Sequence, residues 1–186
     1  KELLNTDEGK SIGLSYLTQR EIGESSIEKF KIGYCPSSKN SFSNRAIEHG
    51  FKKELLEKVG LSILKGNQLL DRFSGRIIFP IQSLSGRTLG FGGRVLKKEK
   101  KAKYINSPES EIYYKSKILY GIYQGKNNIV KQDNCYLVEG YTDVVALHKV
   151  GIENCVASSG TSLTKEQIQL IKRLTQNITI LFDGDQ

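Results

Sequence analysis

Residues 135–143 (C-Y-L-V-E-G-Y-T-D) constrain the fold more than any other part of the chain. The apolar run 136–138 is typical of a buried strand, and the apolar stretch 144–150 predicts a helix that leads away from it. Gly140 permits the tight turn between the two elements. We therefore expect Glu139 at the carboxyl end of a strand, the edge of an open α/β sheet where ligands bind.

A second apolar run, residues 178–182, leads into D-G-D at residues 183–185. With a short strand at 155–157, the order strand-helix-strand-helix-strand predicts a right-handed parallel sheet. Adjacent carboxylates repel each other unless cations lie between them, and oxygen ligands suit Mg²⁺ or Mn²⁺. A D-G-D sequence by itself is most often a surface turn. Its expected position next to Glu139 favours a metal site instead. The carboxylates expected to meet there belong to Glu139, Asp143, Asp183 and Asp185.

Composition narrows the class of protein. The 186 residues include 28 Lys and Arg against 20 Asp and Glu, so polyanionic partners are favoured, although many basic proteins bind nothing acidic. No apolar run approaches membrane-spanning length, and no signal peptide opens the chain. Cys35, Cys135 and Cys155 lack C-x-x-C spacing, so we expect reduced core cysteines in a cytoplasmic protein and no structural zinc in this chain.

The N-terminal half divides at about residue 70. Before it, the pattern predicts helices at 11–19, 25–30, 43–48 and 52–58 and an extended segment at 31–36. After it, runs 76–82 and 88–96 predict a strand hairpin. The second strand contains three glycines, Gly90, Gly92 and Gly93. Their missing side chains would let a backbone or a flat ligand approach closely, and a twisted hairpin without any ligand would account for these glycines equally well. Pro108 is expected to open a helix, and residues 127–128 (N-N) to form a loop.

Basic and aromatic residues alternate between residues 87 and 120. Nine Lys and Arg side chains lie between residues 87 and 117, with four tyrosines among them or just after them. Phosphate contacts from cations, together with stacking on aromatic rings, are the basis of single-strand binding. The run 97–101 is typical of a solvated surface, whereas Arg94, Lys103 and Lys115 stand in more ordered contexts.

These motifs carry a family resemblance. V-E-G-Y-T-D followed by an apolar strand into D-G-D resembles the Toprim domain of primases, topoisomerases and some nucleases. Seven segments in order over residues 30–186 narrow the resemblance to the catalytic core of bacterial DnaG-type primases. They are F-K-I-G-Y-C-P-S, D-R-F-S-G-R-I-I-F-P-I, G-F-G-G-R-V-L, K-Y-I-N-S-P-E-S, Y-K-S-K-I-L-Y-G, E-G-Y-T-D-V-V-A-L-H and A-S-S-G-T-S-L-T-K-E-Q.

The resemblance implies an α/β fold in two parts. Residues 1–130 would form a mixed α+β subdomain with a basic nucleic-acid-binding groove, and residues 131–186 the first part of a Rossmann-like Toprim sheet. The implied activity is template-directed synthesis of short RNA primers on single-stranded DNA, with ribonucleoside triphosphates as substrates, an RNA–DNA hybrid as product and Mg²⁺ or Mn²⁺ as cofactor. A zinc module before this segment and a helicase-binding region after it are expected in the complete bacterial cytoplasmic protein.

The resemblance also implies residue roles. Glu139, Asp183 and Asp185 would be catalytic metal-binding carboxylates, with Asp143 beside them as a further ligand. The cations expected to face a nucleotide, the template or the nascent strand are Arg94, Lys103 and Lys115, with Arg76 as a further candidate. Tyr104 and Asn106 would support this nucleotide or nucleic-acid site. Thr142 and Ser162 depart from the family's usual residues at positions without chemistry.

Three alternatives remain open. Another Toprim enzyme, such as a nuclease or topoisomerase, would share the carboxylates but lack the upstream basic motifs. A phosphatase with a nucleophilic aspartate would place L-F-D-G-D at the start of its domain. A non-catalytic single-stranded-DNA-binding module would need no metal. The isolated segment is expected to be impaired or inactive as an enzyme.

Overall fold

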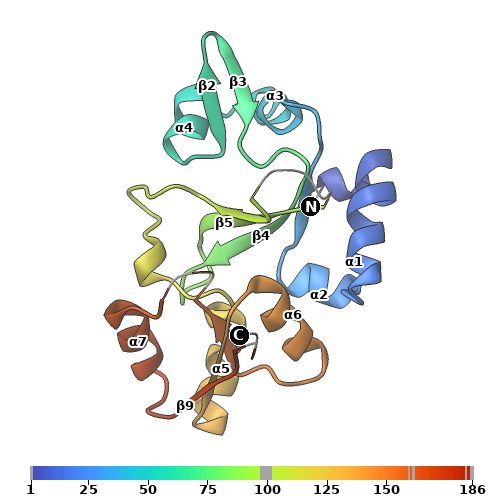
Figure 1. Ribbon diagram of the computed structural model, residues 1–186. Coiled ribbons are helices and arrows are strands. Elements are labelled where there is room, and N and C mark those ends of the chain that lie inside the picture. Colours follow the sequence, from blue (N-terminus) through green and yellow to red (C-terminus); the bar gives the residue numbers. More distant parts are fainter. Residues whose placement is uncertain (1, 97–101, 159, 161, 183, 185–186) are drawn as a thin grey trace.

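The computed structural model describes residues 2–96, 102–158, 160, 162–182 and 184. An antiparallel sheet (β1-β4-β5-β6), a hairpin (β2-β3) and a parallel sheet (β8-β7-β9) organise them (Figure 1). The strands are β1 Gly33–Cys35, β2 Ser62–Lys65, β3 Gln68–Asp71, β4 Arg76–Gln82, β5 Thr88–Val95, β6 Tyr104–Asn106, β7 Cys135–Val138, β8 Cys155–Ala157 and β9 Ile178–Ile180. The helices are η1 Glu2–Asn5, η2 Gly9–Leu14, α1 Ser15–Gln19, α2 Glu24–Lys29, α3 Ser41–Glu48, α4 Lys53–Lys58, η3 Lys115–Lys117, α5 Ile122–Gln132, α6 Tyr141–Lys149 and α7 Lys165–Lys172.

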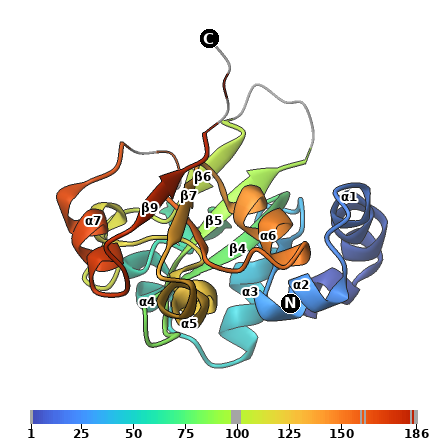
Figure 2. The same ribbon diagram turned by 90° about the horizontal axis from the view of Figure 1, so that it is seen from below.

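The parallel sheet confirms the predicted α/β class and the predicted succession of strands and helices along residues 135–180. β7 is the central strand and pairs in parallel with β8 on one side and β9 on the other. Alternate side chains face opposite layers: Leu137 packs with Ile129 of α5 and Ile171 of α7, whereas Ala157 packs with Val144 of α6. Figure 2 shows α6 and α7 on opposite sides of β7. Helices therefore cover both faces, as apolar parallel strands require.

The antiparallel sheet contains both predicted strands, joined by the turn at Gly86. Pro80 lies within β4 although it has no N–H to donate. It is opposite Phe91, whose N–H and C=O bond Ser107 on the other side of β5. Pro80 is also beyond Ile78, the last residue of β4 that pairs with β1. The proline therefore removes no bond from either ladder.

Two glycines of β5 accommodate aromatic rings of the protein itself. A Cβ at Gly92 would lie 2.4 Å from Cε2 of Tyr141, and one at Gly90 would lie 2.5 Å from Cδ2 of Tyr113. Both tyrosines are buried. The close approach expected at the glycine-rich strand is thus made by internal side chains that pack on β5.

Three local predictions were wrong. Residues 127–128 lie within α5, because Ile122 and Ile129 are buried and Gly125 lets the helix approach the carbonyl oxygens of Glu153 and Cys155. The segment before Asp71 contains the hairpin β2-β3, with Lys65 opposite Gln68 across a two-residue turn. No helix follows Pro108; residues 107–114 have neither helix nor strand, and Pro108 packs against Gly60.

One apolar core joins the two sheets. Phe79 of β4 stacks on Tyr141 of α6 with ring centroids 5.4 Å apart, and Tyr120 meets Tyr141 edge-on at 4.7 Å. Backbone bonds of 3.0 Å in both directions connect Tyr120 to Ala157 of β8. The expected subdomain boundary at 130/131 lies inside α5, which packs on β8. One core cluster therefore contains residues from both sides of the expected boundary, and the division into two subdomains stays a prediction.

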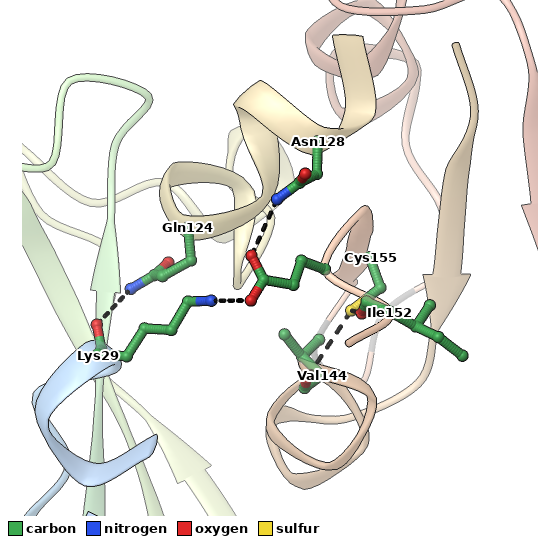
Figure 3. A network of polar contacts seen from close by, with 7 residues as sticks. Lys29, Gln124, Asn128, Val144, Ile152 and Cys155 are labelled. Atoms are coloured by element: carbon green, nitrogen blue, oxygen red, sulfur yellow. Dashed lines mark hydrogen bonds and ion pairs between the residues drawn. The ribbon is translucent and has the colours of Figure 1, made fainter. Parts of the chain in front are cut away.

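A polar network ties α2 to the second half at the surface. Lys29 Nζ donates to Glu153 Oε1 at 2.7 Å, and Asn128 donates to Glu153 Oε2 at 2.9 Å. Gln124 donates to the carbonyl oxygen of Lys29 at 3.4 Å (Figure 3).

None of the helices in the described ranges is long and apolar enough to cross a membrane.

Candidate functional site

A cavity of about 370 Å³ lies where α1, the β5-β6 pair and the start of α6 meet. It brings together six of the predicted site residues: Arg94, Lys103, Tyr104, Asn106, Glu139 and Asp143. Arg20, Gly140, Tyr141, Thr142 and Gly160 complete its lining. The acidic and basic motifs are therefore at one place, although 35 residues lie between Lys103 and Glu139 in the sequence. Asp183 and Asp185 lie outside the described residues.

The acidic side of the cavity is built by the turn from β7 into α6. Glu139 follows the last residue of β7 and is exposed, as expected for the carboxyl end of a parallel strand. β9 runs beside β7, with Leu181 N donating to Leu137 O at 2.8 Å. Phe182, the residue before Asp183, follows directly. The chain thus approaches D-G-D next to the strand that carries Glu139.

Asp143 has a structural role in addition to its place in the cavity. Its Oδ2 accepts a hydrogen bond from Gly140 N at 2.9 Å, and this bond closes the first turn of α6. A carboxylate in the first turn also interacts favourably with the helix dipole. Thr142 Oγ1 lies 3.5 Å from Asp143 Oδ1 and 3.4 Å from the Tyr104 hydroxyl. Thr142 therefore connects the acidic side to the basic side.

Arg94 and Tyr104 form the buried basic side. They are directly opposite each other in the β5-β6 pair, and Arg94 Nη1 donates to the Tyr104 hydroxyl at 2.7 Å. The guanidinium carbon also lies 5.2 Å from the centre of the Tyr104 ring. Arg94 is only 6% exposed, so this cation is held in one position by its packing.

Asn106 is the last residue of β6, and Lys103 is the residue before this strand. The side-chain oxygen of Asn106 accepts a hydrogen bond from the Tyr141 hydroxyl, and a supporting role of Asn106 at a nucleotide site stays a prediction. Lys103 precedes β6, and its side chain is exposed at the cavity. The segment 97–101, predicted to be a solvated surface, lies outside the described residues.

Arg76 and Lys115 do not line the cavity. Arg76 is buried, and its Nη1 donates to Gly93 O and Ala102 O, both at 3.1 Å, so it braces β5 against the segment before β6. Lys115 begins η3, where its backbone N donates to Glu109 Oε1 at 2.9 Å. Contact of either side chain with a phosphate stays a prediction.

Sequence reasoning gave no role to Arg20, the third cation that lines the cavity. Arg20 follows α1 and stands four residues after Tyr16, so the two side chains lie on the same face of the helix. The four-residue spacing of a tyrosine and an arginine was the sequence feature that could have indicated this position. Among the described residues, no group of three or more His, Cys, Asp or Glu side chains could hold a metal ion.

Comparison with known proteins gives this site a family. Residues 1–126 match the family described as "DNA primase catalytic core, N-terminal domain", and residues 136–186 match "Toprim-like". The DNA primase of Synechococcus elongatus is 41% identical over 192 residues; the alignment covers 100% of this chain and 27% of that protein.

Solved structures agree with the sequence comparison. The RNA polymerase domain of Mycobacterium tuberculosis primase DnaG superimposes with a TM-score of 0.92 at 36% identity, covering 100% of this chain and 62% of that one. A DnaG primase catalytic domain bound to single-stranded DNA gives 0.89 at 37% identity, covering 100% and 58%. The chain belongs to the DnaG-type DNA primases and forms part of their catalytic core, with a Toprim-like region at residues 136–186.

Proposed function

We propose that this chain is the part of a primase core that binds single-stranded DNA and ribonucleoside triphosphates for the synthesis of RNA primers. The observation that carries the proposal is the cavity in which Glu139 and Asp143 face Arg94 and Lys103. Phosphoryl transfer needs positioned cations around phosphate oxygens and carboxylates that hold divalent ions. The single-stranded DNA bound to a relative's catalytic domain supports the same role.

Glu139 and Asp143, with Asp183 and Asp185, would hold Mg²⁺ or Mn²⁺. Their carboxylate oxygens fit the ligand preference of these ions, and the exposed position of Glu139 at the end of β7 leaves it accessible to solvent. Bound divalent ions would supply neutralisation of phosphate charge and a lower pKa for an attacking hydroxyl. In the described part of the chain, the bond from Gly140 to Asp143 fixes the turn on which Glu139 stands.

The basic side would bind and orient phosphates. Arg94 is held rigidly by Tyr104, so it presents a positive charge without having to be ordered on binding. Lys103 is exposed at the same cavity and would reach a phosphate as a point charge. Asn106 would act indirectly, through Tyr141 and the start of α6. The RNA–DNA hybrid would occupy the groove between these elements, and Arg76 and Lys115 would act outside the cavity.

The test is ribonucleotide incorporation by a full-length protein that contains this chain, on a single-stranded DNA template with Mg²⁺ or Mn²⁺. We expect short RNA products that disappear with EDTA and return when the metal is restored. Metal-independent binding of single-stranded DNA without any incorporation would instead favour a non-catalytic binding module. Cleavage of the template would favour a nuclease of the Toprim class.

We propose further partners only for the full-length protein that contains this chain. The chain spans 27% to 31% of the length of its first curated relatives, which leaves room there for a zinc module and a helicase-binding region. We expect a replicative helicase as a partner and the bacterial cytoplasm as the location. Coupling of helicase and primer synthesis in a reconstituted reaction would test the partner.

A further inference from the structure

The short helix η3 takes its position from hydrogen bonds. It lies between two buried anchors, Tyr113 and Leu119, but none of its own residues is buried. At its start, Lys115 N donates to Glu109 Oε1 at 2.9 Å. Because η3 has no apolar anchor of its own, its polar contacts determine where Lys115 stands.

The start of α7 binds the carbonyl groups of this segment. Gln167 Nε2 donates to Ile118 O at 2.8 Å and to Lys115 O at 3.3 Å. Thr164 Oγ1 donates to Ser116 O. Three of the four carbonyl oxygens of residues 115–118 thus accept a bond from α7 or its N-cap residue. In Figure 1, the yellow segment that contains η3 lies beside α7.

The amide group suits Gln167 to this contact. Its side chain is completely buried, and its Oε1 accepts a hydrogen bond from Thr164 N at 3.2 Å, as a capping box requires. An ionised glutamate would complete the same box, but only the amide also has N–H donors for Lys115 O and Ile118 O. A buried group whose polar atoms are all bonded keeps one orientation, so Gln167 fixes η3 firmly.

Lys115 is the cation of η3 that is available for an anion. The Nζ atom of Lys117 lies 4.9 Å from the centre of the Tyr114 ring, which attracts it. The Lys115 side chain is half-exposed, and no ion pair in the described ranges involves it. Its ammonium group can therefore meet a phosphate, while its backbone is held by Glu109 and Gln167.

We infer that Gln167 is a positioning residue, which holds η3 so that the ammonium group of Lys115 meets a phosphate of the bound ligand. This role rests on the proposed function, in which Lys115 acts outside the cavity, and it adds the start of α7 to the elements that support phosphate binding. The phosphate belongs either to a nucleoside triphosphate or to the backbone of single-stranded DNA, because both present the same oxygens. Separate titrations distinguish the two sources.

The experiment uses variants of a full-length protein that contains this chain. Gln167→Met keeps the length of the side chain but removes its hydrogen bonds, Lys115→Ala removes the cation, and a double variant combines the two changes. Lys117→Ala is the charge control. Thr175→Val is the stability control, since Thr175 is also buried, donates to Asp133 Oδ1 at 2.8 Å and lies beyond the other end of α7. For each protein, Kd is measured for ATP with Mg²⁺ and, separately, for a single-stranded oligonucleotide.

We expect Lys115→Ala to raise Kd on the order of 10-fold for at least one of the two ligands, because a charge-assisted contact is lost. Gln167→Met should raise the same Kd about 3- to 10-fold, since Lys115 is then no longer held in place. The double variant should bind like Lys115→Ala to within about twofold, because Gln167 acts only through Lys115. Lys117→Ala and Thr175→Val should bind within about twofold of wild type. The ligand whose Kd changes is the source of the phosphate.

An additive loss in the double variant would overturn the inference, because Gln167 would then act independently of Lys115. A loss in Thr175→Val equal to that in Gln167→Met would do the same, since general destabilisation would explain both. Unchanged Kd values in Lys115→Ala or in Gln167→Met, or an equal loss in Lys117→Ala, would also contradict the inference.

If Gln167→Met fails to fold in a thermal melt, two variants of Thr164 decide. Thr164→Val removes the bond to Ser116 O and should lose affinity, whereas Thr164→Ser keeps a hydroxyl and should retain it. The titrations do not require synthesis. A protein that makes primers but binds independently of Gln167 contradicts only this inference, and one that binds through Lys115 and Gln167 but never incorporates ribonucleotides contradicts only the proposed function.

Discussion

The hydroxyl of Tyr141 donates a hydrogen bond to the side-chain oxygen of Asn106, which joins the first residue of α6 to the last residue of β6. Asn106 is opposite Gly92 in the β5-β6 pair, and the Tyr141 ring covers Gly92. Tyr141 follows Glu139 by two residues. This contact, together with the one between Thr142 and Tyr104, therefore holds the acidic turn next to the strand pair that carries Arg94.

Tyr141→Phe keeps the ring but removes this bond. We expect the free energy of unfolding to fall by about 1 kcal/mol, because the oxygen of Asn106 loses its partner in a partly buried setting. Urea denaturation measures the change. Tyr123→Phe on α5 is the control, since that ring is 38% exposed and its loss of a hydroxyl should have no effect. Equal stability of Tyr141→Phe and wild type would mean that the bond adds nothing.

Gly92→Ala tests the close packing on β5. The new methyl group would lie 2.4 Å from the buried Tyr141 ring, so the ring or the strand must move, at a cost of about 1–3 kcal/mol. Thermal and urea melts should show this loss, together with weaker ligand binding at the cavity. Gly23→Ala is the control because no atom lies within 4 Å of a Cβ there. A fully stable Gly92→Ala protein would contradict the packing described.

His148 predicts a pH dependence of stability. Burial lowers its pKa from 6.5 to about 4, with Lys29 adding to the shift and Glu153 opposing it. The folded protein therefore holds a neutral imidazole where the unfolded chain would bind a proton. Stability should be complete above pH 6.5 and decline as the pH falls toward 4, by on the order of 2–3 kcal/mol. Urea melts across this range measure the decline.

His148→Leu should flatten that decline. Glu153 also has a lowered pKa, chiefly through its bond from Lys29, so its own contribution is lost only as the pH falls below about 4.5, its ordinary value. The window from pH 6.5 to 5 consequently reports His148 alone among these groups. A wild-type and a His148→Leu protein with the same slope in this window would show that the imidazole is not buried as described.

The parallel sheet was predictable from the sequence because its strands are short apolar runs. Glycines and helix-capping residues mark where these runs end. At the start of α7, Thr164 and Gln167 form the two hydrogen bonds of a capping box, at 3.1 and 3.2 Å. Glu139, at the end of one such run, was placed correctly for the same reason. The pairing of Arg94 with Tyr104 was not predictable, since β6 has only three residues and no alternation to indicate it.

The elements that were missed carry weak local signals. In β2, Ile63 and Leu64 are adjacent and both 47% exposed, so this strand has no alternation of apolar buried and polar exposed residues. The two-residue turn, with Gly66 at a φ of 59°, was the available indication. Residues 127–128 of α5 were taken for a loop because asparagines are poor helix formers. Tertiary packing of Ile122 and Ile129 outweighs that preference.

Lys103→Ala tests the exposed cation of the cavity. We expect weaker binding of single-stranded DNA or nucleoside triphosphate and, for DNA, a salt slope lower by about 0.7. Lys131→Ala is the control, because Lys131 is exposed on α5 and does not line the cavity. Equal losses in the two variants would mean that bulk charge alone governs binding.

Glu139→Gln tests the central claim most directly. The substitution preserves the shape of the side chain but removes the charge that would hold a divalent cation beside Arg94 and Lys103. The measurement is ribonucleotide incorporation by the full-length protein on single-stranded DNA with Mg²⁺ or Mn²⁺, alongside DNA binding and a thermal melt. We expect synthesis to fall on the order of 10²- to 10⁴-fold with binding and melting unchanged. Undiminished synthesis by a folded Glu139→Gln protein would contradict the account.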